Sequence, residues 1–122
     1  RILLLGVGPI LTEALAASDD LKTKGIELAI ASMGSIKPLD TEFLSKMITS
    51  GYEQWISLEE HHKCGGLGST LLEWLYENKN TSIRLIRMGV GDHFIHEIGN
   101  QNYVREEEGL NRKAIARVAE HL

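Results

Sequence analysis

Apolar residues along the chain follow two alternating patterns, one typical of strands and one typical of helices. The segment 2–7 is a short apolar run closed by glycines, which predicts a strand buried on both faces. The next segment, 9–24, places its apolar residues at helical spacing and predicts an amphipathic helix. The same patterns predict further strands at 26–31, 52–58 and 83–88, and further helices at 41–49, 67–77, 101–107 and 112–122.

Residues with special backbone or hydrogen-bonding properties stand at the ends of these predicted elements. Pro9 suits the first turn of the first helix. Gly25 suits the turn that ends it, because glycine adopts the left-handed conformation at little cost. Asp40 is placed to cap the helix at 41–49 by accepting hydrogen bonds from its free amides.

Strands separated by helices of about ten residues predict a parallel sheet, because each crossover returns the chain to the same end of the sheet. We therefore predict an α/β fold with three layers, a mainly parallel sheet and helices on both faces. Ligands of such sheets bind beyond the carboxyl ends of the strands. In this chain those ends are the segments 6–9, 32–37, 59–68 and 89–96.

Length and composition narrow the classes of function. A chain of 122 residues is one domain, 1–122, and its formal net charge of −4 provides no positive field for nucleic acid or for an anionic membrane surface. No apolar run approaches the roughly 20 residues that a membrane span needs. The single cysteine, Cys64, cannot form a disulfide within the chain, so the cytoplasm is the expected compartment. Because the chain begins with Arg1 rather than Met, we expect it to be part of a longer protein.

Most of the residue types that carry chemistry follow the third and fourth predicted strands. A metal site could be assembled there from histidines and a cysteine, namely His61, His62, Cys64, His93 and His96. Their spacing is not that of common zinc sites, which pair their ligands as in C-x-x-C, whereas adjacent side chains in H-H-x-C diverge. Loop histidines bonded to the backbone are the simpler interpretation, and we predict no metal ion in this chain.

Glycines open the predicted helix at 67–77 and suggest a phosphate cradle. Gly65, Gly66 and Gly68 free backbone amides where the helix dipole favours anions, and Ser69 adds a hydroxyl. The motif is incomplete, since neither the Walker sequence nor G-x-G-x-x-G is present. The alternative is close packing of this helix, which small residues permit. We therefore define a candidate anion-binding or domain-contact loop, made of Glu60, His61, His62, Gly65, Gly66, Gly68 and Ser69.

Direct catalysis by this loop is not supported by its spacing. Cys64 next to two histidines does not by itself have the geometry of an activated thiolate. Glu59 and Glu60 point to opposite sides if the strand continues through them, so they do not form an acid/base pair. We predict no catalytic residue in this chain.

Several motifs occur in the order of a known domain. They are GVGPILTEALAAS at the first strand, SIKPLD after the second, SLEEHHKCGGLGSTLLEWL from the third and MGVGDHFIHEIGN from the fourth. Together they resemble the C-terminal domain of the transketolase-like thiamine diphosphate enzymes. This group includes transketolase, deoxyxylulose phosphate synthase and the beta subunits of 2-oxo acid dehydrogenases. EEH followed by GGLGS is most similar to transketolase, whereas Ser35-Ile36 and Gly91-Asp92 depart from the synthase pattern.

The resemblance implies a flavodoxin-like strand order 2-1-3-4, with segment 6–9 beside segment 60–68. It also implies that thiamine diphosphate and a divalent metal are held between the pyrophosphate- and pyrimidine-binding domains of the complete enzyme. The GDH sequence at 91–93 lacks the glycine and the asparagines of a thiamine diphosphate and magnesium motif. We therefore expect the 122-residue chain to bind no cofactor by itself. In the complete enzyme, a homodimer, we expect it to pack on the pyrophosphate- and pyrimidine-binding domains.

We predict a structural or assembly domain, inactive by itself, of an enzyme that transfers a two-carbon ketol unit between sugar phosphates. One alternative is a self-standing regulatory module that binds a small anion or a nucleotide at the carboxyl edge of the sheet. Another is the C-terminal domain of a deoxyxylulose phosphate synthase.

Overall fold

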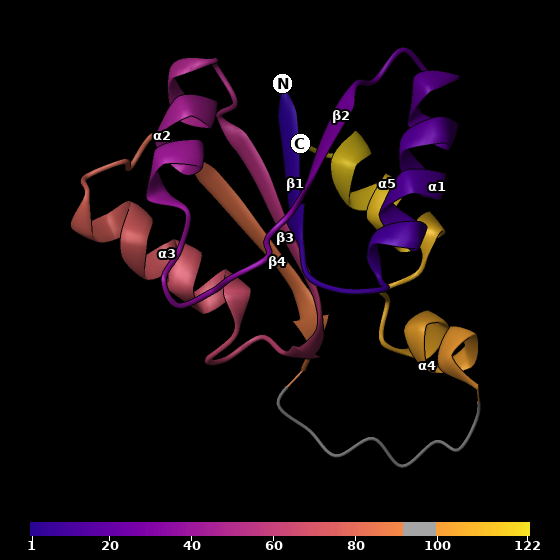
Figure 1. Ribbon diagram of the computed structural model, residues 1–122. Coiled ribbons are helices and arrows are strands. Elements are labelled where there is room, and N and C mark those ends of the chain that lie inside the picture. Colours follow the sequence, from indigo (N-terminus) through magenta and orange to yellow (C-terminus); the bar gives the residue numbers. More distant parts are fainter. Residues whose placement is uncertain (92–99) are drawn as a thin grey trace.

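The computed structural model describes residues 1–91 and 100–122 and contains a parallel four-stranded sheet (Figure 1). The strands are β1 (Ile2–Gly6), β2 (Leu28–Ser32), β3 (Gln54–His62) and β4 (Arg84–Val90). Their order in the sheet is β2-β1-β3-β4. The predicted α/β fold and the 2-1-3-4 strand order are therefore confirmed.

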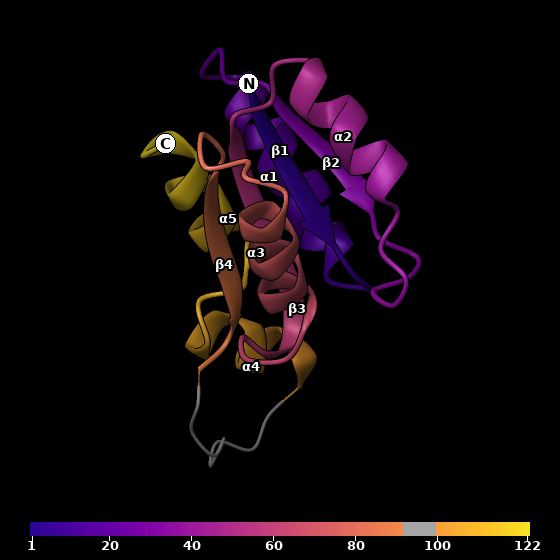
Figure 2. The same ribbon diagram turned by 90° about the vertical axis from the view of Figure 1, so that its left-hand side faces the viewer.

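Helices cover both faces of the sheet, so the molecule has three layers (Figure 1 and Figure 2). α1 (Leu11–Lys22) and α5 (Arg112–Glu120) pack side by side on one face, while α2 (Thr41–Thr49) and α3 (Leu67–Glu77) cover the other. α4 (Gln101–Glu107) lies near the carboxyl ends of β3 and β4. No helix in the described part of the chain is long and apolar enough to cross a membrane.

The strands carry apolar side chains in both directions, which gives the sheet a core on each face. In β1, Leu3 and Leu5 belong to the core under α2 and α3, whereas Ile2 and Leu4 belong to the core under α1 and α5. Trp55 of β3 is fully buried in the first of these cores. Burial on both faces explains why the strands appear in the sequence as apolar runs rather than as an alternating pattern.

The predicted ends of α1 and α2 are only partly matched by the structure. Asp40 caps α2 as predicted, because its Oδ1 accepts a hydrogen bond from the backbone amide of Phe43 at 3.0 Å. Gly25 follows α1 with a φ of 73°. The start of α1 differs from the prediction, since Pro9 lies in the preceding turn and its carbonyl accepts a hydrogen bond from the Thr12 hydroxyl at 3.0 Å.

β3 extends beyond the end that the apolar pattern predicts, and it contains an irregularity there. Leu58 pairs with Met88 and His62 pairs with Val90, so β3 has extra residues between two pairs that are close together in β4. Gly89 of β4 lies opposite this bulge, where a Cβ would approach the backbone of the bulge within 2.9 Å. The extra residues are polar, which is why the apolar pattern stopped before them.

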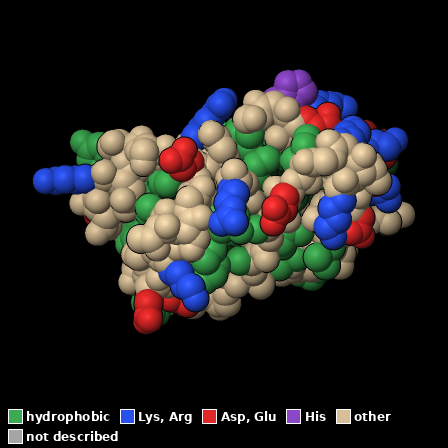
Figure 3. Space-filling view, turned by 90° about the horizontal axis from the view of Figure 1, so that it is seen from above, with side chains coloured by type: hydrophobic (Ala, Val, Ile, Leu, Met, Phe, Trp, Pro, Cys, Tyr) green, Lys and Arg blue, Asp and Glu red, His purple; other side chains and the backbone are tan. Residues whose placement is uncertain are grey.

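The surface at the top of Figure 1, near the N-terminus, shows charged side chains of both signs (Figure 3). Lys, Arg, Asp and Glu side chains are spread among hydrophobic and other groups, and no large area of this face carries one sign of charge. This distribution agrees with the modest net charge of −4.

Candidate functional site

The candidate site is the β3–α3 junction, which runs from Leu58 to Ser69 at the carboxyl edge of the sheet. β1 lies next to β3, and the backbone amide of Val7 donates to the carbonyl oxygen of Leu58 at 3.2 Å. The loop after β1 therefore lies beside the junction, as the strand order implies. All residues of the predicted candidate loop fall within this one stretch, which includes the end of β3 and the first turn of α3.

Glu59 is the central residue of the junction, although it was not among the predicted candidate residues. It is only 1% exposed. Its Oε1 accepts a hydrogen bond from the backbone amide of Leu67, and its Oε2 accepts one from that of Gly68, both at 2.9 Å. These amides lie in the first turn of α3, where backbone donors have no partner inside the helix. The carboxylate satisfies them and places a negative charge at the positive end of the helix dipole.

Two glycines of the junction make room for this arrangement. A Cβ at Gly66 would collide with the carboxylate of Glu59. A Cβ at Gly68 would lie 2.7 Å from the Oγ of Ser57, which is closer than real Cβ contacts come. The glycines therefore allow α3 to begin directly against the buried end of β3.

The contacts of Glu59, Gly66 and Gly68 help to distinguish the two interpretations of the candidate loop, which are anion binding and close packing of α3. The amides at the start of α3 donate to Glu59, so an anion at that point would have to displace a buried carboxylate. The tight contacts at Gly66 and Gly68 favour an architectural role for the glycines. Anion binding by the loop stays a prediction, and such a site would need other donors.

Ser69 stabilises the loop that precedes α3 through hydrogen bonds to its backbone. Its Oγ donates to the carbonyl oxygen of Lys63 at 2.8 Å and accepts from the backbone amide of Gly65 at 3.1 Å. Nη1 of Arg87 also donates to this oxygen at 3.3 Å. Gly65 has a φ of 78°, in the left-handed region that favours glycine. The hydroxyl thus shapes the loop through contacts within the chain.

The two histidines of the candidate loop are exposed, as is the neighbouring Cys64. Nδ1 of His62, the last residue of β3, lies 2.9 Å from the carbonyl oxygen of Gly91, so this histidine contacts the backbone as predicted. Within residues 1–91 and 100–122, no group of three or more His, Cys, Asp or Glu side chains is arranged to hold a metal ion. The two other candidate ligands lie outside the described residues; they are His93 and His96.

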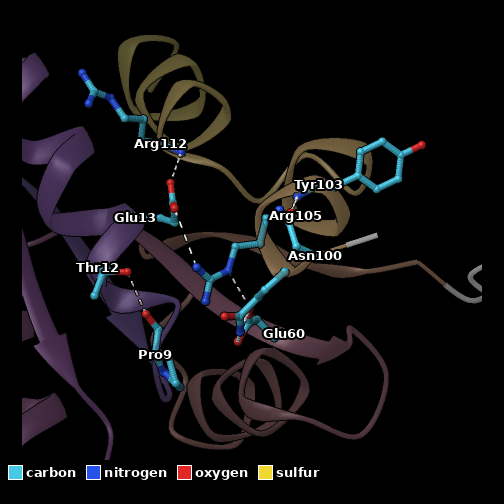
Figure 4. A network of polar contacts seen from close by, with 9 residues as sticks. Pro9, Thr12, Glu13, Glu60, Asn100, Tyr103, Arg105 and Arg112 are labelled. Atoms are coloured by element: carbon cyan, nitrogen blue, oxygen red, sulfur yellow. Dashed lines mark hydrogen bonds and ion pairs between the residues drawn. The ribbon is translucent and has the colours of Figure 1, made fainter. Parts of the chain in front are cut away.

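Glu60 belongs to a second polar cluster (Figure 4). Its Oε1 accepts a hydrogen bond from Nε of Arg105 in α4 at 2.6 Å, and Nη1 of Arg105 lies 3.7 Å from Oε1 of Glu13 in α1. Arg105 is 6% exposed, so a buried guanidinium joins α4 to β3 and α1. Glu59 contacts α3 instead, so the two adjacent glutamates point to opposite sides, as the sequence predicts.

Glu13 extends this cluster to α5. Its Oε2 accepts a hydrogen bond from the backbone amide of Arg112 at 2.8 Å. The guanidinium of Arg112 in turn makes two hydrogen bonds to Asp20 of α1, at 2.8 and 2.9 Å. These contacts link the start of α5 to α1 through Glu13, Asp20 and Arg112. They do not place a nucleophile next to a base.

Known proteins are similar to this chain along nearly its whole length. The family model for the transketolase C-terminal domain matches residues 1–115. A 1-deoxy-D-xylulose-5-phosphate synthase from Heliobacterium modesticaldum is 31% identical over 121 residues, which cover 99% of this chain and 18% of that protein. One of the subunits of an apulose-4-phosphate transketolase from Actinobacillus succinogenes is 33% identical over 119 residues, which cover 98% of this chain and 38% of that protein. The chain therefore spans well under half the length of these relatives.

Solved structures share the fold. A split-gene transketolase, described as an inactive beta4 tetramer, aligns with a TM-score of 0.86 at 27% identity and covers 99% of this chain, which matches 38% of the other. A transketolase from Campylobacter jejuni aligns with a TM-score of 0.61 over 100% of this chain and 17% of its own; at 17% identity this likeness shows the fold alone. The chain belongs to the transketolase C-terminal domain family, as the C-terminal domain of a transketolase-like protein.

Proposed function

We propose that this domain serves assembly rather than catalysis in a transketolase-like enzyme. The observation that carries the proposal is at the start of α3. The carboxylate of Glu59 accepts hydrogen bonds from the amides of Leu67 and Gly68, which could otherwise bind a phosphate group. The second polar cluster likewise ties α1, α4 and α5 around the carboxyl end of β3. Both sets of contacts hold the backbone at this edge in one arrangement, so the edge can serve as a surface that packs against another domain.

In this proposal, the complete enzyme transfers a two-carbon ketol unit between sugar phosphates in the cytoplasm. Thiamine diphosphate and its divalent metal ion belong to the pyrophosphate- and pyrimidine-binding domains, on which this domain packs within a homodimer. The described residues do not fit a diphosphate–metal pair, because the amides at the start of α3 are occupied by Glu59. Nor does any metal-holding group of side chains lie within residues 1–91 and 100–122.

The relatives supply a second candidate for the complete enzyme, the deoxyxylulose phosphate synthase. Several of them are 1-deoxy-D-xylulose-5-phosphate synthases, at 31 to 34% identity. The transketolase subunit from Actinobacillus succinogenes is 33% identical, so the two branches stand at similar distances. The motifs EEH and GGLGS are most similar to transketolase, and for this reason we propose transketolase rather than the synthase. A self-standing regulatory module is compatible with the fold, but a family of domains from larger enzymes gives it no preference.

A test on the isolated chain addresses the absence of catalysis. We expect calorimetric titration with thiamine diphosphate and Mg²⁺ to give no saturable heat, and a ketose phosphate with an aldose phosphate acceptor to give no ketol transfer. A dispersed NMR spectrum of the same sample shows that the chain is folded. Binding at one equivalent, or turnover above a buffer blank, would contradict the proposal.

A domain exchange addresses assembly. This chain replaces the matching C-terminal segment of the apulose-4-phosphate transketolase subunit from Actinobacillus succinogenes, to which it is 33% identical. We expect the hybrid to keep the oligomeric size of its parent in sedimentation experiments, whereas the parent without its C-terminal segment loses it. A hybrid that folds but sediments like the truncated parent would overturn the assembly role.

A further inference from the structure

β4 is the last strand of the sheet, and one of its edges has no neighbouring strand in the described part of the chain (Figure 2). The amide of Arg84 donates to the carbonyl oxygen of Glu53, which precedes β3, at 2.9 Å, so the backbone of Arg84 faces β3. Successive residues of a strand direct their backbone groups to opposite sides, so those of Leu85 and Arg87 face the open edge. This edge can therefore accept hydrogen bonds from, and donate them to, a further strand.

Two cavities lie along the open edge, one on each face of the sheet. The first has a volume of about 220 Å³, lies on the α3 face, and is lined by Leu72, Tyr76 and Leu85 among others. The second has a volume of about 290 Å³, lies on the α5 face, and is lined by Ile86 and Val118 among others. The side chains of a strand point alternately to the two faces of its sheet. A strand added beside β4 would therefore place successive side chains in the two cavities.

The first cavity has apolar walls that the described part of the chain leaves uncovered. Leu72 is 48% exposed and Tyr76 is 79% exposed, although both are large apolar side chains. They lie on the flank of α3 next to β4, and Leu85 of β4 is only partly buried between them and the open edge. Neighbouring exposed apolar side chains are typical of interaction surfaces. The edge thus offers apolar contacts in addition to backbone hydrogen bonds.

β4 also carries two cations that no carboxylate in the described part of the chain neutralises. No ion pair between described residues includes Arg84 or Arg87. Arg87 lies on the α3 face, where its Cδ is 2.9 Å from the position of a Cβ on Gly68 and its Nη1 donates to the neutral Oγ of Ser69. Arg84 is exposed, and its position three residues earlier places it on the α5 face. Each face therefore combines one cavity with one cation.

The order of these features along β4 indicates what kind of segment is complementary to it. Opposite Leu85 and Ile86 the cavities favour apolar side chains, whereas opposite Arg84 and Arg87 the cations favour carboxylates. The complementary segment is extended and carries carboxylate, apolar, apolar and carboxylate side chains in that order, which is the same in either strand direction. A second copy of β4 does not match, because the arginines of both copies would face one another.

We propose that the open edge of β4 binds an extended segment of another polypeptide with this pattern, by addition of a strand to the sheet. The backbone groups of Leu85 and Arg87 bond to the segment, and its two apolar side chains enter the two cavities. Its carboxylates pair with the guanidinium groups of Arg84 and Arg87. The proposal does not depend on the assembly role of the β3–α3 junction, because it concerns a different edge of the sheet.

An NMR titration of the 122-residue chain tests the proposal with short peptides. The probe is acetyl-TEVVET-amide, and acetyl-TKVVKT-amide is its matched control. We expect saturable shifts of the β4 amides with the acidic peptide, and binding of the basic peptide at least about tenfold weaker, because its charges repel the two arginines. No saturable shift with the acidic peptide, or equal binding of the two peptides, would overturn the proposal.

Hydrogen exchange in the same samples tests whether the peptide binds as a strand. The amides of Leu85 and Arg87 face the open edge, so the acidic peptide should slow their exchange. The amide of Ile86 already faces β3 and should keep its rate. Shifts without this alternation would contradict strand addition. Sedimentation of the chain without peptide tests the other occupant, since a dimer that already protects the Leu85 amide would assign the edge to a second copy and overturn the proposal.

Variants assign the binding to the two arginines. Arg84→Gln and Arg87→Gln should each weaken binding of the acidic peptide about two- to fivefold, since each removes one exposed ion pair. Arg117→Gln is the matched control, because it removes an exposed arginine of α5 next to α1 and should leave binding unchanged. If Arg87→Gln perturbs the fold, the exposed Arg84 decides the question alone. Equal binding by the parent chain and Arg84→Gln would contradict the predicted pairing.

Discussion

Glu59 fills the space that a side chain at Gly66 would need. From this position its carboxylate accepts hydrogen bonds from the next two backbone amides, at 2.9 Å each. A charged side chain from the adjoining strand therefore closes the start of α3. This relationship explains why the sequence resembles a phosphate cradle while the described structure uses the same amides internally.

The first prediction concerns the contribution of Glu59 to stability. Glu59→Ala leaves two buried amides without acceptors, so we expect the free energy of unfolding to fall by about 2–4 kcal/mol. Urea denaturation followed by circular dichroism measures the change. Glu73→Ala, the same substitution at an exposed position of α3, should change stability by no more than about 0.5 kcal/mol. Similar losses in the two variants would argue against a special role for Glu59.

The second prediction tests the match between Glu59 and Gly66 directly. Gly66 has a φ of −97°, which alanine adopts without strain, so the cost of Gly66→Ala comes from the collision with the carboxylate. We expect a loss of about 1–3 kcal/mol in the parent chain and a clearly smaller loss in the Glu59→Ala background. A double-mutant cycle of unfolding free energies measures the difference. Strict additivity would contradict the steric explanation.

The third prediction uses chemical rescue. Glu59→Ala leaves a small cavity next to the free amides of Leu67 and Gly68, and formate can supply the missing carboxylate there. We expect sodium formate to raise the melting temperature of the variant more than that of the parent. Sodium chloride at the same ionic strength is the control. Equal effects of formate on both proteins would show that the amides do not capture a carboxylate.

The fourth prediction concerns the buried guanidinium of Arg105. Arg105→Ala leaves Glu60 partly buried without its cation, so we expect a loss of about 2–4 kcal/mol in the free energy of unfolding. Arg112→Ala breaks an ion pair whose side chains are 53% and 39% exposed, and it should cost about 1 kcal/mol or less. Glu60→Gln in the Arg105→Ala background should recover part of the stability. No recovery would indicate that the loss comes from packing rather than from an unpaired carboxylate.

Local signals were sufficient to predict most of the fold. The bounds of α3, Leu67–Glu77, agree with the predicted helix, because its apolar positions recur at helical spacing and glycines precede it. Asp40 was predicted as a cap from its place before α2. The strand order came from the resemblance to a known family, since periodicity specifies strands but not their neighbours. The bulge at the end of β3 lacked an apolar signal, so the length of that strand was underestimated.

The residues of the candidate loop lie together in the structure, whereas Glu59 and Arg105, which make the buried contacts around it, are absent from the predicted set. Sequence spacing correctly placed Glu59 and Glu60 on opposite sides of β3, but it did not show what each would contact. Glu59 reaches α3 because a bulge and two glycines bring the helix start against it. Arg105 is far from Glu60 and Glu13 in sequence, so their cluster appears only once the chain is folded. The histidines are candidates by residue type alone, whereas the packing at this junction depends on the buried Glu59.

Amide hydrogen exchange at the start of α3 tests the central claim most directly. The amides of Leu67 and Gly68 lie in the first helical turn, where donors without a partner exchange rapidly. If Glu59 holds them, both should be protected in the parent chain and lose protection in Glu59→Ala, while amides in the middle of α3 remain protected. Rapid exchange of both amides in the parent chain would show that the carboxylate does not close this helix, and would contradict the account.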